Sequence, residues 1–361
     1  MKRFLLFGFF ILFVACAKNE PAAEANEPES TETYESETMP DVVQPTTELP
    51  PEVEMPIYIN PLTGLETAEE LYQKRPFAIV VNNLKKALPQ SGVSEADIIY
   101  EVLAEGGITR LVCVGQNFVG EKIGPIRSAR DYFIDFALDN EAVFVHHGGS
   151  PGAYSFINKN NIDDIDGMAL EGITFFRDQE RVLQRGLEHS SYVISPKILE
   201  AMDSFGIIHE LSGGKQPMFN FYKEESTVAD AESANKITLP YSDYQNSYFE
   251  YGQEENIYFR FQNGEAHIDE ATGSQLSVKN VIVQFADMDI IDQEGRMEVG
   301  LVGEGTGYLF TGGKYMPIVW EKDSHFSQTR WYDTNGDLLT INKGKTWINV
   351  FDADLEIFIN N

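Results

Sequence analysis

The stretch ADIIYEVLAEGGITRLVCVG, residues 96 to 115, decides the fold of this chain. Two apolar runs flank Gly106-Gly107, and a glycine pair between such runs is the turn chemistry of a β-hairpin. The second run, LVCVG, contains Cys113, which we expect to be a buried strand residue and not a nucleophile. The stretch therefore predicts two adjacent antiparallel strands in the core.

The flanking sequence adds more strands and two helices. RPFAIVVNN (75–83) and EAVFVHHGG (141–149) are continuous apolar runs bounded by polar residues, which indicates buried strands. SARDYFIDFALDN (128–140) has helical spacing of apolar residues, and AYSFINKNN (153–161) is a shorter helix candidate. Alternating strands and helices predict a layered α/β arrangement.

The second half of the chain has a different pattern. From about residue 236 onward, short β-type runs alternate with turn signals every 8 to 12 residues or so, as in a meander, sandwich or small barrel. We expect a mixed α/β N-terminal domain (57–215) followed by a β-rich C-terminal domain (216–361), an α+β or α/β chain overall.

The N-terminus predicts export and lipidation. Lys2 and Arg3 precede the apolar run FLLFGFFILFVA, which is too short to span a bilayer and is followed directly by Cys16. Residues 1–15 resemble a bacterial lipoprotein signal peptide, in which Cys16 is lipidated and anchors the protein to the membrane; an uncleaved N-terminal anchor is the alternative. A diacylated cysteine would give stable attachment, with the folded part on the extracytoplasmic face.

Charge and composition narrow the class of partner. Residues 16–56 are rich in Glu, Pro, Thr and Ser and should form a disordered acidic tether. The chain carries a net charge of −30, which argues against nucleic-acid binding. No CxxC pair exists, and the Asp333–Asp337 run lacks the glutamate of a calcium loop, so we expect no metal and no cofactor.

Several motifs resemble the YerB-like lipoproteins of Gram-positive bacteria, which carry a domain of unknown function numbered 3048. The N-terminal motifs are NPLTGL (60–65), RPFAIVVNN, PQSGVSEADIIYE (89–101), EGGITR (105–110), IGPIRSARDYFIDFA (123–137) and HGGSPGAY (147–154). SVKNVIVQFADM and TWINV are similar to the family's C-terminal domain. The resemblance implies a two-domain envelope lipoprotein and supplies no activity. Where relatives tend to show His-Asn-Leu-Tyr, this chain reads His189-Ser-Ser-Tyr192.

Two candidate catalytic groups follow the strand at 141–149. Gly148-Gly-Ser-Pro-Gly152 matches a nucleophile elbow, but Pro151 has no N–H for an oxyanion hole. Ser150 is better interpreted as a helix cap, with Pro151 in the first turn. His146 and His147 should point to opposite faces of a strand.

The two histidines leave several interpretations open. Either could do acid–base work, helped by Glu101 or Asp131, or one of them could bind a metal together with Asp131, Glu101 or Glu105 from neighbouring elements. Alternatively, one is a buried, hydrogen-bonded core residue and the other lies at the end of the strand.

The segment GPIRSAR concentrates positive charge in an acidic chain. We expect Ser128 to cap the following helix, with Arg127 at its mouth and Arg130 in its first turn, and Arg110 to share a strand face with Glu101 and Glu105. The arginines then either form internal ion pairs or, with Ser128 and glycines 107, 124, 148 and 149, hold an anion.

Aromatic residues and location complete the prediction. Trp320, Trp331 and Trp347 either pack the β domain's core or form an aromatic binding face.

We expect a non-enzymatic binding or scaffolding protein whose partner is a cell-wall polymer or a wall-synthesis protein. The alternative is an enzyme acting on an anionic envelope substrate, held by the arginines beside a histidine.

Overall fold

An eleven-stranded mixed sheet runs through both halves of the sequence. The computed structural model describes residues 56–214, 216–226 and 231–361, and residues 55–361 form one compact unit. The predicted signal peptide, Cys16 and nearly all of the predicted tether lie outside the described residues. In the described part of the chain, no helix has both the length and the apolar composition needed to cross a membrane.

The strand order places the N-terminal half at one end of this sheet and the C-terminal half at the other. In order across the sheet, the strands are β11 (Glu232–Ser233), β21 (Lys314–Lys322), β20 (Gly303–Thr311), β17 (Asn280–Ala286), β24 (Thr346–Asp352), β4 (Ile98–Leu103), β5 (Thr109–Gly115), β3 (Phe77–Asn82), β6 (Val143–His146) and β7 (Asp164–Asp166), with β22 (Arg330–Asp333) beside β21. β24 joins the halves, because it pairs in parallel with both β17 and β4.

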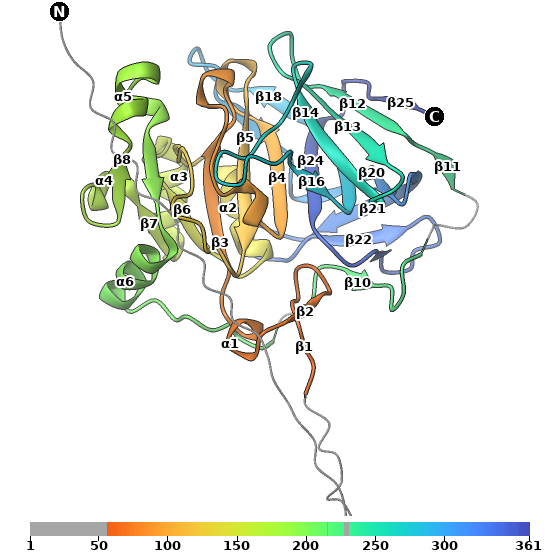
Figure 1. Cartoon of the computed structure of the whole chain (residues 1–361), viewed down its shortest axis with the longest axis horizontal. Coiled ribbons are helices and arrows are strands. Elements are labelled where there is room, and N and C mark those ends of the chain that lie inside the picture. The colour runs from red at the N-terminus through yellow and green to blue at the C-terminus, as the bar shows by residue number, and fades with distance from the viewer. Residues whose placement is uncertain (1–55, 215, 227–230) are drawn as a thin grey trace, which may run out of the picture. The chain divides into compact units, whose positions relative to one another are not determined.

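Helices belong to the N-terminal half, as Figure 1 shows. They are α1 (Glu69–Tyr72), α2 (Asp131–Asp139), α3 (Pro151–Asn160), α4 (Gly167–Leu170), α5 (Gln179–Arg185) and α6 (Ser195–Phe205). The predicted α/β N-terminal region and β-rich C-terminal region are therefore both present. The boundary predicted at residue 215 falls between α6 and β10 (Asn220–Phe221), and the two regions share the long sheet.

A second sheet of six strands belongs to the C-terminal half. Its strands are β15 (Glu265–Ala266), β14 (Ile257–Gln262), β13 (Asn246–Gly252), β12 (Lys236–Pro240) and β25 (Phe358–Asn360), with β16 (Ser277–Val278) beside β14. The remaining strands form pairs: β1 (Tyr58–Ile59) with β2 (Glu66–Thr67), β8 (Phe175–Arg177) with β9 (Ser191–Val193), β18 (Met288–Ile290) with β19 (Met297–Val299), and β10 with β23 (Thr340–Ile341).

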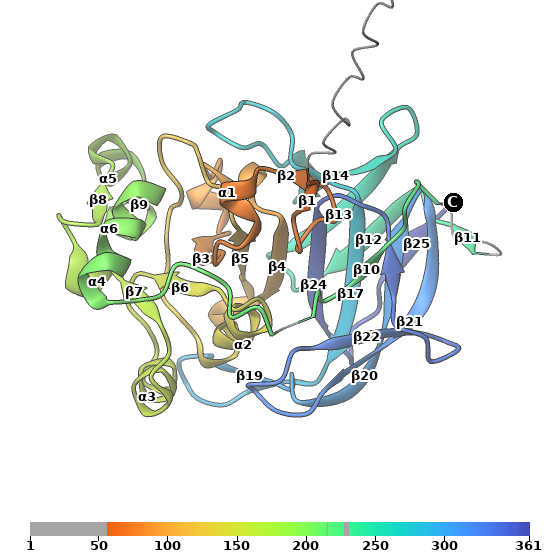
Figure 2. The ribbon, with the colours of Figure 1, turned by 90° about the horizontal axis from the view of Figure 1, so that it is seen from below.

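Two hydrophobic cores lie on opposite faces of the long sheet. α2 packs Phe133 and Phe136 against one face, while the six-stranded sheet packs Phe249 and Tyr258 against the other. Figure 2 shows α2 and strands β12–β14 on opposite sides of β4 and β24. Because both faces are covered, β3, β4 and β5 are buried along their whole length.

Most local predictions from the sequence are confirmed. β4 and β5 form the antiparallel hairpin around Gly106 and Gly107, whose φ angles of 71° and 72° suit glycine. Cys113 is fully buried in β5, and burial raises the pKa of its thiol. Ser150 caps α3 by accepting the Ala153 N–H at 3.1 Å.

The aromatic binding face predicted as an alternative is wrong for the three tryptophans. Trp320, Trp331 and Trp347 are 2%, 1% and 0% exposed, and all three pack in the two hydrophobic cores.

Candidate functional site

Arg110 and Arg130, two of the predicted cluster of arginines, both pair with the carboxylate of Glu105. Glu105 forms an ion pair with Arg110 and lies 2.6 Å from an Arg130 nitrogen, while Arg110 also donates to the Ser128 carbonyl at 2.8 Å. Burial and neighbouring Arg130 lower the pKa of Arg110 to about 10. Burial alone would raise the pKa of Glu105, but the two arginines outweigh it and the pKa is lowered. The cluster is thus an internal ion-pair network.

The predicted shared face of Arg110 and Glu101 is wrong. The hairpin register pairs Arg110 with Val102 and Leu111 with Glu101, so the two charged side chains point to opposite faces of the sheet. The three-residue turn at 105–107 sets this register, and a shift of one residue reverses the face of every side chain.

Ser128 does not cap α2, so that prediction is also wrong. The N-cap position is Arg130, and the Ser128 hydroxyl instead donates to the His147 carbonyl at 3.1 Å. Arg127 lies away from the Glu105 network. It donates to the Glu188 carbonyl at 3.3 Å and pairs with the Glu188 carboxylate at 3.4 Å.

His146 is buried between two acceptors. Its Nδ1 lies 2.9 Å from the Gly148 carbonyl and its Nε2 lies 3.0 Å from the Asp164 carboxylate. A carbonyl can only accept, so Nδ1 carries a proton that is committed to Gly148. The predicted partners Glu101, Glu105 and Asp131 do not contact it; the strand pair β6–β7 supplies Asp164 instead.

His147 forms a contact that superficially resembles a catalytic dyad. Its Nδ1 lies 2.8 Å from the Ser191 hydroxyl, while Arg177 donates to its Nε2 at 3.0 Å. Because arginine has no acceptor, Nε2 must be the unprotonated nitrogen and Nδ1 must donate to Ser191. Burial and the charge of Arg177 lower the pKa of His147. The imidazole therefore cannot take the Ser191 proton in this arrangement.

The other predicted residues are dispersed. Asp131 is exposed at the start of α2 and forms no ion pair with any described residue. Gly148 donates its N–H to Asp166 at 2.8 Å, and the Gly149 backbone bridges to Ala129. His189 Nδ1 lies 2.9 Å from the side-chain nitrogen of Asn82. Within the described ranges, no group of three or more His, Cys, Asp or Glu side chains could hold a metal ion.

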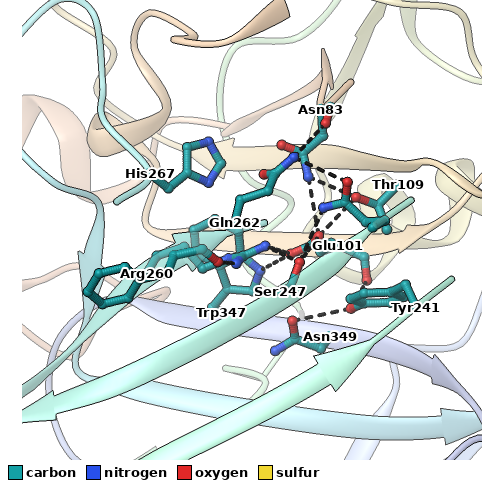
Figure 3. A network of polar contacts seen from close by, with 12 residues as sticks. Asn83, Glu101, Thr109, Tyr241, Ser247, Arg260, Gln262, His267, Trp347 and Asn349 are labelled. Atoms are coloured by element: carbon teal, nitrogen blue, oxygen red, sulfur yellow. Dashed lines mark hydrogen bonds and ion pairs between the residues drawn. The ribbon is translucent and has the colours of Figure 1, made fainter. Parts of the chain in front are cut away.

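Glu101 belongs to a buried network that the sequence interpretation missed (Figure 3). Its carboxylate and the Arg260 guanidinium are both 0% exposed and lie 2.7 Å apart. Asn83, Thr109 and Ser247 donate to Glu101 Oε1, and the Trp347 indole donates to Oε2 at 3.2 Å.

Aromatic rings complete the enclosure of this network. The rings of Phe249 and Trp347 each lie 5.0 Å from the Arg260 guanidinium. Glu101 is therefore enclosed between the two sheets and is unavailable to a substrate.

The sequence gives only half of this pair. Glu101 lies within the apolar run IIYEVL, and a buried charge needs a partner. The β14 segment IYFRFQ conceals that partner, because the apolar Ile257, Phe259 and Phe261 lie on one face and Arg260 on the other, yet the face of Arg260 is the buried one.

Comparison with known proteins gives a consistent result for both halves. Residues 62–208 match the N-terminal domain model of the protein family of unknown function DUF3048, and residues 237–348 match its C-terminal domain model. The protein named "Putative lipoprotein YerB" of Bacillus subtilis is 33% identical over 305 residues, covering 80% of this chain and 85% of that protein. The crystal structure of the Bacillus subtilis YerB protein superimposes with a TM-score of 0.75 at 32% identity, covering 84% of this chain and 99% of that one.

Proposed function

We propose that this chain, which belongs to the DUF3048 family of YerB-like proteins, is a membrane-anchored extracytoplasmic lipoprotein that binds a protein partner without catalysis. The related protein carries the name "Putative lipoprotein YerB", and here Cys16 directly follows a short apolar run. A diacylated Cys16 would hold the folded part at the outer face of the membrane, joined by the acidic segment.

An exposed apolar surface around α4 and α5 carries the proposal. Met168, Ile173, Leu183 and Leu187 are 66%, 69%, 87% and 60% exposed. We call these four residues the α4–α5 surface. They come from one sequence block, 168–187, and the helices of that block, α4 and α5, lie at one end of the molecule in Figure 1. Large apolar side chains that folding leaves in water suit a protein partner better than a polyhydroxylated wall polymer.

Polar contacts hold this surface in one arrangement. Arg177 of β8 donates to the Leu187 carbonyl at 2.9 Å and forms an ion pair with Glu171 at 2.7 Å, which ties the segment after α5 to the segment after α4. The apolar side chains are therefore displayed from an anchored backbone. Such preorganisation lowers the entropic cost of binding.

The catalytic alternative has less support because its candidate groups are committed internally. Arg110 and Arg130 share Glu105, Glu101 is sealed with Arg260, and His147 Nε2 accepts a hydrogen bond from Arg177. Arg127 is the exception, because the side chain of its partner Glu188 is 63% exposed. A solvent-exposed carboxylate can be displaced by an anionic substrate, so this alternative can be tested at Arg127.

Site-specific photo-crosslinking in intact cells tests the proposal. A photoreactive residue at Leu183 should give a discrete protein adduct, and the Leu187→Glu change should abolish it. The matched control is Tyr244, which is 75% exposed on the C-terminal half and should give no such adduct. Equal adducts from both positions, or none from Leu183, would overturn the proposal.

Thermal unfolding with phosphate and sulfate tests the enzyme alternative. A ligand at one hundred times its dissociation constant adds about 2.7 kcal/mol to stability. If either anion raises the midpoint of residues 56–361, and Arg127→Ala abolishes the rise without lowering the midpoint itself, the anionic-substrate function replaces the one proposed here.

A further inference from the structure

A cavity of about 600 Å³ lies beside α1, and none of the arginine and histidine residues considered above lines it. Its wall comes from residues 59–62, 72–76, 139–141, 211–213 and 216–221, together with Gln116 and Gln328. Figure 1 shows α1, β1 and β10 close together at the lower edge of the molecule. The volume falls within the range of small-molecule sites, roughly 300 to 1,000 Å³.

Much of the cavity wall is apolar. Leu62 and Met218 are buried side chains from two segments that meet only through the fold, and Tyr72 and Phe221 add aromatic rings. This part of the wall would hold the apolar body of a ligand, and an aromatic ring also attracts a cation.

Two glutamine side chains that line the same cavity have oxygens without a hydrogen-bond donor. Gln116 and Gln328 both line it, and the side-chain oxygen of each is buried without a hydrogen-bond partner in the described part of the chain. Gln116 is 6% exposed.

The amide orientation of both glutamines is fixed by their nitrogens. Gln116 donates to the Lys74 carbonyl at 2.6 Å and Gln328 donates to the Asp139 carbonyl at 3.0 Å. A flipped amide would turn its oxygen toward the carbonyl oxygen that its nitrogen now binds, and two acceptors cannot form a hydrogen bond. Each side-chain oxygen is therefore an acceptor that lacks a donor.

The charge of the cavity wall points the same way. No lysine or arginine is among the described residues that line it. Asp139 forms an ion pair with Lys322. The Glu141 carboxylate forms no ion pair with a described residue and accepts from the N–H and hydroxyl of Ser212 at 2.9 and 3.1 Å, while Arg75 Nε donates to the Glu141 backbone carbonyl at 2.9 Å. The cavity therefore combines acceptors with one carboxylate that no ion pair neutralises.

The backbone at Glu141 is a further sign that this carboxylate has a use. Its φ angle is 52°, in the left-handed region directly after α2, where glycine or asparagine is the usual residue. A glutamate there accepts a conformational cost that glycine would avoid, and strained positions of this kind gather at ligand sites.

We propose that this cavity binds an amphipathic amine, with the ammonium group at Glu141, Gln116 and Gln328 and the apolar body against Leu62 and Met218. This small-molecule site rests on the proposed function only in that both describe a binding protein. The cavity and the α4–α5 surface share no residue, so either proposal can fail while the other stands.

Three probes with one apolar body test the ligand class by calorimetry on residues 56–361. They are 3-phenylpropylamine, 3-phenylpropanol and 3-phenylpropionate. The amine should bind at least tenfold more tightly than the alcohol, because a charge-assisted bond to a carboxylate exceeds a neutral one. The carboxylate should not bind. Equal binding of all three probes, preferred binding of the carboxylate, or no binding of the amine would overturn the proposal.

Matched variants locate the site. Glu141→Gln should weaken the amine tenfold or more and leave the alcohol unchanged, while Gln328→Leu should weaken both. Glu200→Gln and Gln184→Leu remove the same groups from exposed positions outside the cavity wall and should change neither. The amine should also shift the methyl NMR signal of Met218. An amine affinity that Glu141→Gln leaves intact would show binding elsewhere on the acidic surface and would overturn the assignment.

Discussion

Removal of one partner of the Glu101–Arg260 pair should destabilise the protein more than any surface ion pair could. Both side chains are 0% exposed, and the charges lie 2.7 Å apart between the two sheets. Arg260→Gln leaves a carboxylate that has lost its cation but still faces four neutral donors, including the Trp347 indole. Breaking a buried pair in this way costs about 3 to 5 kcal/mol, and we expect about 4 kcal/mol here.

A double-mutant cycle separates the pair from the rest of the network. Glu101→Gln alone should cost a similar amount, because it leaves the guanidinium buried and unpaired. The double variant removes both charges of this pair and should cost less than the sum by about 2 kcal/mol or more, since residues in contact couple by up to about 3 kcal/mol.

Urea unfolding of residues 56–361, followed by tryptophan fluorescence, measures these values. Arg296→Gln is the control, because it removes an ion pair to Asp292 in which both side chains are more than a quarter exposed, and should cost less than about 1 kcal/mol. If Arg260→Gln also costs less than about 1 kcal/mol, or if the two single effects add without coupling, the pair does not fasten the sheets together.

Four further outcomes follow from named groups. Glu105→Gln should lower stability by about 3 kcal/mol in urea unfolding, because two neighbouring arginines lose their shared carboxylate; a loss below about 1 kcal/mol would contradict the network. Burial raises the pKa of Asp135 to about 6, against an unfolded value near 3.8, so its contribution is present below pH 4 and is lost as pH rises through about 6. Asp135→Asn should therefore gain stability relative to the native chain across this pH window, as a series of urea midpoints would show; a constant difference would refute the assignment. Ser191 should resist a fluorophosphonate probe that labels activated serines, and labelling that Ser191→Ala removes would show that the contact between His147 and Ser191 is catalytic. Cys113 should react with a thiol reagent only at the rate of unfolding, because it is fully buried; rapid labelling of the native protein would place it at the surface.

Local patterns in the sequence were sufficient where a few neighbouring residues determine the structure. The hairpin at Gly106-Gly107 and the Ser150 cap of α3 each depend on a single short stretch of consecutive residues. The prediction that Ser128 caps α2 failed although it was also local. The Ser128 hydroxyl is drawn to the His147 carbonyl, an acceptor from another element that the sequence around 128 does not reveal.

Long-range pairing was the part that could not be predicted. β24 lies between β17 and β4, and the paired residues Ile348 and Tyr100 are separated by nearly the whole folded chain. A continuous apolar strand indicates burial on both faces but carries no information on its neighbours. The same gap explains why Glu101 was grouped with Arg110, whereas its partner Arg260 comes from the second sheet.

The fate of the charged residues suggests where function lies in this fold. Arg110 and Arg130 drew attention because positive charge is scarce in an acidic chain, yet folding occupies both of them, since they pair with the same carboxylate of Glu105 in the hairpin turn. A binding surface needs groups that folding leaves unsatisfied. Among the described residues these are apolar side chains such as Leu183, which folding leaves in water, and acceptors such as Gln116 Oε1, which folding removes from water without a donor. Neither kind stands out in a sequence, because leucine and glutamine become informative only when their exposure and partners are known.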